Sequence, residues 1–138
     1  MKKVLYVYGG PEFHPTKAAG ELLAGILKRD GRFELDMTSD LDVFINLPDG
    51  KYDAVIVYTT GLNDQLKGER EKGLLNFVKN GGGFVGIHSA ANSFRGSYAY
   101  IDMLGSEFLT HSPFHDFTVS IVNKEHYITT RVPDFKVK

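Results

Sequence analysis

Short apolar runs bordered by turn-forming residues constrain the fold of this chain more than any other feature. The runs lie at residues 3–8 (KVLYVY), 53–58 (DAVIVY) and 83–88 (GFVGIH). Short runs with little polar alternation are typical of strands that are buried on both faces of a parallel sheet. The sequence therefore predicts an α/β domain with such a sheet at its centre.

The segments between these runs show helical spacing, with apolar residues recurring every three or four positions. We expect helices at residues 15–30, 64–80 and 98–104, a further strand at 32–36, and a half-exposed strand at 115–123. Alternating strands and helices predict a doubly wound, mainly parallel, flavodoxin-like sheet. The tail from Glu125 shows no final helix. We expect a single domain over residues 1–138 that lacks a last strand and helix.

The composition excludes several classes of protein. A net charge of -1 gives no reason to expect nucleic acid or an anionic membrane as a partner. The first apolar run is too short for a signal peptide or a membrane span, so we expect a cytoplasmic protein. The chain has no cysteine, which rules out thiolate nucleophiles and cysteine ligands. Any metal must therefore be held by His, Asp or Glu.

A histidine stands where the strand at residues 83–88 ends. Ligands of open α/β sheets bind outside the carboxyl ends of the strands, so His88 is a candidate for catalysis or metal binding. We expect His14, after the first strand, and His111, in a later loop, to face the same crevice. Three imidazoles with an open position suit a divalent metal, zinc before others, and His115 is a further candidate ligand. The alternative is that a ring nitrogen of His88 only links two loops and has no part in catalysis or metal binding.

Other side chains near these strand ends are candidates for ligand binding. Arg95 offers a positive charge, Tyr98 an aromatic ring for a sugar, and Ser89 a hydroxyl, although a serine there also suits the start of a helix. The acidic residues that could orient the histidine rings are Glu12, Glu107 and Asp116. The glycine clusters at residues 9–10 and 81–83 match no dinucleotide or P-loop spacing, so no nucleotide cofactor is expected.

Several motifs along nearly the whole chain share one resemblance. They are YGG at residues 8–10, FH at 13–14, GGFVGIHSAA at 82–91, LG at 104–105, FLTHSP at 108–113, DFTV at 116–119, HYIT at 126–129 and VPDF at 132–135. Together they resemble the trehalose-utilisation (ThuA-like) family, which is related to the class I glutamine amidotransferase fold. The Asp-Glu-x-Tyr segment that follows in that family, with its closing strand and helix, is absent from this sequence.

The resemblance places His88 at the bend that holds the nucleophilic cysteine of amidotransferases, and Ala90 where a glycine would ease that bend. An imidazole does not replace a thiolate, so glutamine hydrolysis through a thioester is excluded. The exposed apex of such a bend is its central residue, which disfavours Ser89 as a nucleophile.

The resemblance implies a protein of bacterial carbohydrate utilisation that acts on trehalose or a related disaccharide or keto-sugar. In this hypothesis His88, His14 and His111 form a metal-assisted centre, and Tyr98 and Arg95 position the ligand. One alternative is a non-catalytic module that binds a sugar or a protein. Another is a fragment whose site is completed by a missing segment. Each alternative is compatible with a homo-oligomer.

Overall fold

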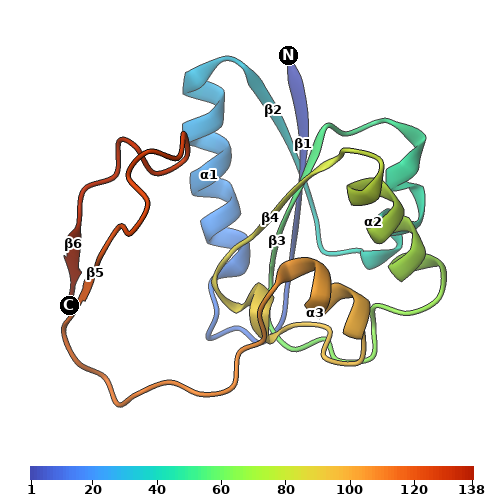
Figure 1. Ribbon diagram of the computed structural model, residues 1–138. Coiled ribbons are helices and arrows are strands. Elements are labelled where there is room, and N and C mark those ends of the chain that lie inside the picture. Colours follow the sequence, from blue (N-terminus) through green and yellow to red (C-terminus); the bar gives the residue numbers. More distant parts are fainter.

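The computed structural model describes all 138 residues and contains the predicted parallel sheet (Figure 1). Its strands are β1 (Lys2–Gly9), β2 (Phe33–Thr38), β3 (Ala54–Thr59), β4 (Gly83–Gly86), β5 (Phe117–Val119) and β6 (Phe135–Val137). Its α-helices are α1 (Thr16–Asp30), α2 (Glu69–Lys79) and α3 (Tyr98–Leu104), and its 3-10 helices are η1 (Leu41–Asp49) and η2 (His88–Asn92). None of the helices has the length and apolar content needed to cross a bilayer.

The main sheet has the strand order β2-β1-β3-β4, and every neighbouring pair is parallel. The chain moves outward from β1 to β2 and then returns to the other side of β1 to place β3 and β4. This order is the flavodoxin-like one, so the predicted fold class is confirmed. The order changes direction between β1 and β3, where ligands of such sheets bind.

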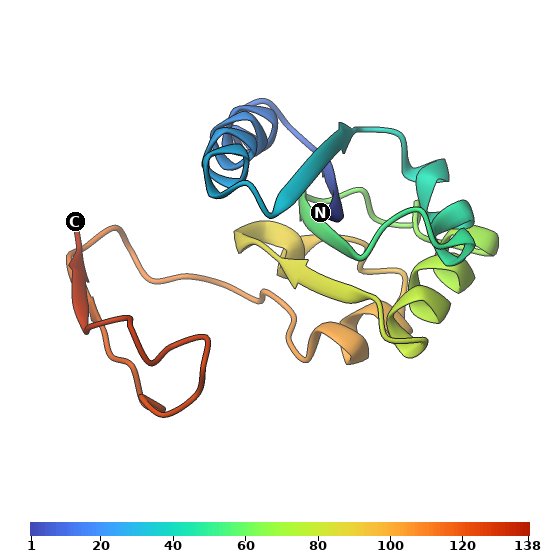
Figure 2. The same cartoon turned by 90° about the horizontal axis from the view of Figure 1, so that it is seen from above.

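Helices cover the two faces of the sheet unequally. On one face, η1, α2 and α3 enclose a core that includes Leu5, Val55 and Phe94, each at most 1% exposed. On the other face, α1 packs on β1 and β2. A Cβ on Gly20 of α1 would lie 2.4 Å from the ring of Tyr6, so the absence of a side chain allows this close approach. Figure 2 shows α1 over the β1–β2 half of the sheet.

Two predictions about the chain before β4 need correction. The helix predicted at residues 64–80 begins only at Glu69, because Asp64 and Gly68 have φ of 64° and 58° and cannot continue a right-handed helix. The stretch before β3 contains η1, which was not predicted. Asp40 caps this helix by accepting a hydrogen bond from the Asp42 amide at 2.9 Å.

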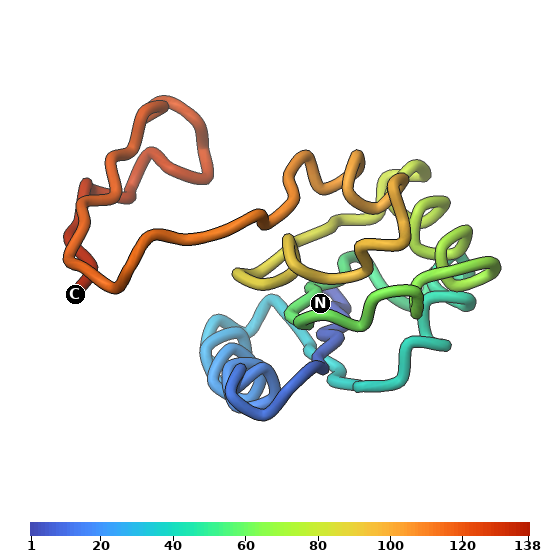
Figure 3. Tube along the Cα trace, turned by 90° about the horizontal axis from the view of Figure 1, so that it is seen from below, coloured from blue at the N-terminus to red at the C-terminus, as the bar shows by residue number.

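Residues 106–138, called the arm below, stand apart from residues 1–105, the body. Figure 3 traces the arm as it leaves the body through one extended stretch after α3. The strand predicted at residues 115–123 is shorter and forms β5, which pairs antiparallel with the unpredicted β6. No residue of the arm is buried. The predicted alternation holds at Val119 and Ile121, which are half-buried between exposed neighbours, but Phe117 is 49% exposed.

Candidate functional site

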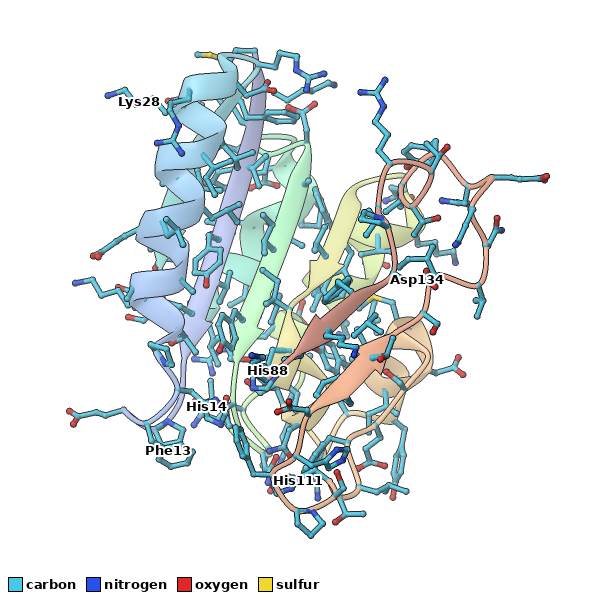
Figure 4. The ribbon with its side chains drawn as sticks, turned by 90° about the vertical axis from the view of Figure 1, so that its left-hand side faces the viewer. Phe13, His14, Lys28, His88, His111 and Asp134 are labelled. Atoms are coloured by element: carbon cyan, nitrogen blue, oxygen red, sulfur yellow. The ribbon has the colours of Figure 1, made fainter.

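The carboxyl ends of β1, β3 and β4 meet at one edge of the sheet. His14 lies in the turn between β1 and α1, and His88 is the first residue of η2, separated from the end of β4 by Ile87 alone. Both labelled histidines lie side by side at this edge in Figure 4. Parallel pairing thus brings together two side chains that are distant in the sequence.

The backbone at His88 makes a sharp bend. His88 has a φ of 47°. This value is uncommon for a residue other than glycine and lies outside the φ range of β-strands and right-handed helices. A Cβ on Gly86 would lie 2.9 Å from Cδ1 of Leu104, so a side chain at this position would displace the Leu104 side chain of α3. The bend leaves the His88 ring exposed at the sheet edge. Strained residues in such positions are a frequent property of functional sites.

Buried hydroxyl groups hold this bend from beneath. The Ser89 hydroxyl donates to the Thr59 carbonyl at 2.9 Å and also contacts the Thr60 hydroxyl. The Thr59 hydroxyl donates to Ser93 Oγ at 2.7 Å, and Ser93 Oγ donates to the Ser89 carbonyl at 3.1 Å. All four residues are buried. The Ser89 hydroxyl is therefore engaged within the protein.

Aromatic rings surround the two histidines. The ring centroids of His14 and His88 are 5.4 Å apart. The Tyr58 ring meets His88 edge-on at 5.9 Å, and the Phe13 ring lies 4.8 Å from His14. These contacts restrict the orientations of both imidazoles, and together the two rings form a pair that one small ligand could contact.

A cavity of about 490 Å³ opens beside this pair. It is lined by His14, His88, Ser89, Ala91, Asn92, Glu107, Phe108 and His111. The volume lies within the range of about 300–1,000 Å³ that is usual for small-molecule sites. The lining combines ionisable, amide and aromatic groups, a mixture that suits a ligand with both hydroxyl groups and an apolar face.

His111 lines the same cavity, but it does not complete a metal site. Its Nδ1 atom lies 2.8 Å from the Ser112 carbonyl oxygen. His115 points elsewhere, with Nε2 at 2.9 Å from the Ser112 hydroxyl. No group of three or more His, Asp or Glu side chains is arranged to hold a metal ion. The residues as placed do not fit a zinc ion, and the metal site stays a prediction.

Arg95 and Tyr98 do not line this cavity. Arg95 donates from Nη2 to the Phe108 carbonyl at 2.6 Å and lies 3.8 Å from the Glu107 carboxylate. Tyr98 is 85% exposed on α3. Arg95 therefore secures the segment that carries Glu107 and Phe108, and the structure leaves direct ligand contact by Tyr98 or Arg95 without support.

Three cavity residues were not anticipated from the sequence: Ala91, Asn92 and Phe108. Asn92 ends η2, and its own carbonyl accepts a hydrogen bond from Gly61 at 2.9 Å. Phe108 donates its backbone amide to the Ala91 carbonyl at 2.8 Å, which joins the start of the arm to the body. Nothing in the local pattern distinguishes Asn92. Phe108 begins the FLTHSP motif, which was a usable signal.

A second cavity, of about 670 Å³, also reaches His14. Its lining includes Tyr8, Glu12, Lys17, Ser39 and Gln65. It lies beside β1, close to the point where the strand order changes direction. A ligand that passes His14 could contact both cavities.

Comparisons with known proteins agree with this architecture. A family model described as ThuA, trehalose utilisation, matches residues 3–138. The crystal structure of a ThuA-like protein from Bacteroides uniformis aligns with a TM-score of 0.79 and 26% sequence identity. The alignment covers 98% of this chain and 57% of that one, so this chain spans little more than half the length of the solved relative. No curated protein matches the chain.

Proposed function

Since the chain belongs to the ThuA (trehalose utilisation) family, we propose that the cavity beside His14 and His88 binds a carbohydrate and supports proton transfer on it. The observation that carries this proposal is the pairing of the two imidazoles, with ring centroids 5.4 Å apart, beside the cavity at the carboxyl edge of the sheet. Imidazole is the side chain best suited to exchange protons near neutral pH.

The residues around the pair suit a sugar. Asn92 and Glu107 offer an amide and a carboxylate to hydroxyl groups, and the Phe108 ring offers an apolar surface to a sugar face. Because a second cavity also reaches His14, a disaccharide could contact both cavities at once. We therefore favour a disaccharide or a keto-disaccharide over a single sugar ring.

In the proposed reaction His88 acts as the general base that takes a proton from a carbon or hydroxyl group of the sugar. His14 donates a proton to the oxygen on which negative charge develops, and the proton held by His88 then returns to the product. Arg95 acts as a positioning residue because it holds Glu107 and the Phe108 carbonyl at the cavity wall. No step is assigned to a metal ion, since no third donor joins the pair in a ligating arrangement.

The second candidate is a module that binds sugar without turning it over. The observation in its favour is that the bend carries no free nucleophile: the chain has no cysteine, and the Ser89 hydroxyl is bonded to Thr59 and Thr60. Binding and turnover must therefore be measured side by side.

The decisive experiment compares the wild-type protein with H88N. Asparagine tolerates a positive φ, so the substitution removes the imidazole with little added backbone strain. We expect sugar binding by calorimetry to change only a few-fold and turnover to fall by about 100-fold or more. His126, which lies on the arm, provides the matched control H126N, for which neither quantity changes.

Each other result has a definite meaning. Turnover by H88N at the wild-type rate would remove His88 from the mechanism. Sugar binding without turnover in the wild-type protein, weakened by H88N, would support the binding module. A divalent ion in the purified wild-type protein that is lost in H88N would establish the predicted metal site.

A further inference from the structure

The second cavity, the one beside β1, is formed entirely by the body. Its lining residues all lie between Tyr8 and Gln65, in β1, the loop after it, α1 and the segments around η1 and after β3. Its volume of about 670 Å³ is within the range that is usual for small-molecule sites. His14 is the one residue that lines both this cavity and the cavity beside His88. A ligand with two units can therefore reach both cavities past His14.

Hydrogen-bond donors without partners stand at the start of α1. Pro15 precedes the helix and no side chain caps it, so the amides of Lys17 and Ala18 have no acceptor within the protein. Thr16 is 6% exposed, and its hydroxyl makes no hydrogen bond. No fully buried side-chain oxygen lacks a partner, so this hydroxyl keeps its open surface toward the cavity that Thr16 lines. The cavity thus offers two amides and a hydroxyl to a ligand.

Acceptor groups line the same cavity. Glu12 and Glu21 contribute carboxylates, and Gln65 contributes an amide oxygen. Tyr8 adds an aromatic ring, which suits the apolar face of a sugar. A hydroxyl group both donates and accepts hydrogen bonds, so a lining that holds donors and acceptors together matches a unit rich in hydroxyl groups.

The charges of the lining disfavour an anion. Lys17 is the only Lys or Arg among the lining residues, and it lies 4.0 Å from the Glu21 carboxylate. Glu12 is therefore left without a basic partner in the cavity. The start of a helix carries about half a positive charge, which is less than the full negative charge of Glu12. A helix N-terminus alone would favour a phosphate group, but this cavity as a whole does not.

The loop between β1 and α1 has a fixed shape beside this cavity. The Thr60 amide donates to the Gly9 carbonyl at 3.1 Å. The His14 amide donates to the Pro11 carbonyl at 3.0 Å. Gly10 has a φ of 111°, and a Cβ there would lie 2.5 Å from the Thr60 carbonyl oxygen. The backbone around the cavity is therefore ordered before a ligand arrives, which lowers the entropic cost of binding.

We propose that the second cavity holds the non-reacting unit of a disaccharide and selects an uncharged unit over a phosphorylated one. The reacting unit lies beside His88, and the amides of Lys17 and Ala18 donate to hydroxyl groups of the other unit. Glu12 determines specificity, since its charge repels a phosphate group at this position. This inference rests on the proposed function, because the reacting unit must occupy the cavity beside His88.

The position of the sugar is tested by NMR on the full chain with trehalose as the probe. We expect trehalose to shift the amide signals of Lys17 and Ala18 in the second cavity together with those of Ala91 and Asn92 beside His88. Glucose, which spans only one cavity, should bind about tenfold more weakly. Shifts at Ala91 and Asn92 alone would overturn this inference and leave the proposed function intact. Shifts at Lys17 and Ala18 alone would overturn the proposed function, and no shift at either pair would overturn both.

The selection by charge is tested by calorimetry with trehalose and trehalose 6-phosphate. We expect the phosphate ester to bind about tenfold more weakly, and the difference to shrink at high salt because exposed charges are screened. E12Q keeps an acceptor oxygen but removes the charge, so the ratio of the two affinities should fall to about twofold. Glu34, an exposed residue of β2, provides the matched control E34Q, for which the ratio stays at the wild-type value. Equal or tighter binding of the phosphate ester by the wild type would overturn the inference, as would an unchanged ratio in E12Q.

Discussion

The body and the arm use apolar residues in opposite ways. In the body, Leu5 and Val55 are at most 1% exposed because neighbouring strands and helices surround them. In the arm, Phe114 and Val122 are 92% and 98% exposed, although 12 of the 33 arm residues are apolar. Apolar side chains become a core only where a second layer of secondary structure covers them. Sequence patterns of burial therefore predict a core only where that second layer exists.

The largest expected contrast between the two regions comes from a large-to-small substitution. Phe44 is 0% exposed and meets the Phe94 ring edge-on at 6.3 Å. F44A leaves a cavity in the body and should lower the free energy of unfolding by about 3–5 kcal/mol. Urea denaturation followed by circular dichroism measures this change.

The matched substitution in the arm is F114A, which should change the free energy of unfolding by less than about 0.5 kcal/mol because the side chain is already in solvent. Measurements at two protein concentrations separate any contribution of association. Similar losses of unfolding free energy for F44A and F114A would mean that Phe114 is buried in solution. The arm and the body would then not differ in the burial of their apolar side chains.

A smaller difference between body and arm is expected in how their tyrosines affect the free energy of unfolding at high pH. Burial, with a lesser contribution from Tyr58, raises the pKa of Tyr6 to about 12. The unfolded chain ionises near the ordinary pKa of about 10, so this stabilisation is complete below about pH 10 and is lost as the pH rises toward 12. The free energy of unfolding should thus fall by about 1–2 kcal/mol over that range.

The variant that tests this is Y6F. It removes the hydroxyl that donates to the Thr16 carbonyl at 2.7 Å, so it is less stable by about 1 kcal/mol at neutral pH, but its alkaline slope is shallower. Y127F, in the arm, changes neither quantity because Tyr127 is 83% exposed. Parallel pH curves for the wild type and Y6F, from urea titrations, would show that Tyr6 is not the group responsible.

The smallest effect concerns the arm alone. The Ile121 amide donates to Asp134 at 3.0 Å, and this bond with the nearby Lys124 ammonium lowers the pKa of Asp134. Because the pKa is lowered, the carboxylate stabilises the folded arm above about pH 4, and this stabilisation is lost as the pH falls. In D134N the Ile121 amide should exchange hydrogen faster, while the urea midpoint of the body stays the same.

Asp116, an exposed residue of the arm, provides the control D116N for this measurement by NMR. Equal exchange rates in the wild type and D134N would show that the Asp134 contact does not order the arm. A shifted urea midpoint would show instead that the arm and the body unfold together.

The strands of the body were predictable because their signals are local. The predicted strands at residues 3–8 and 53–58 match β1 and β3 within one or two residues, and the predicted helix at 98–104 matches α3. The helix η1 was missed, although Leu41, Phe44 and Leu47 recur every third residue and are all buried. That spacing is the period of a 3-10 helix, so the signal was present but not used.

The candidate site was only partly predictable. His14, His88 and His111 were expected to share one crevice, and all three line one cavity. The roles of Ser89 and Arg95 could not be read in the same way, because each depends on partners from other elements: Thr59 for Ser89 and the Phe108 carbonyl for Arg95. A hydroxyl or guanidinium group does not reveal its partner through local spacing.

The sequence alone determined which segments become strands of the parallel sheet and that histidines stand at two strand ends, since backbone propensity and glycine conformation act over a few residues. Only the tertiary structure decided that His14 meets His88, that the Ser89 hydroxyl is buried and that Arg95 bonds the Phe108 carbonyl. These outcomes depend on strand order, register and the layers that pack on each face. They are contacts between distant segments, and their free energy belongs to the assembled sheet and not to any one stretch of the chain.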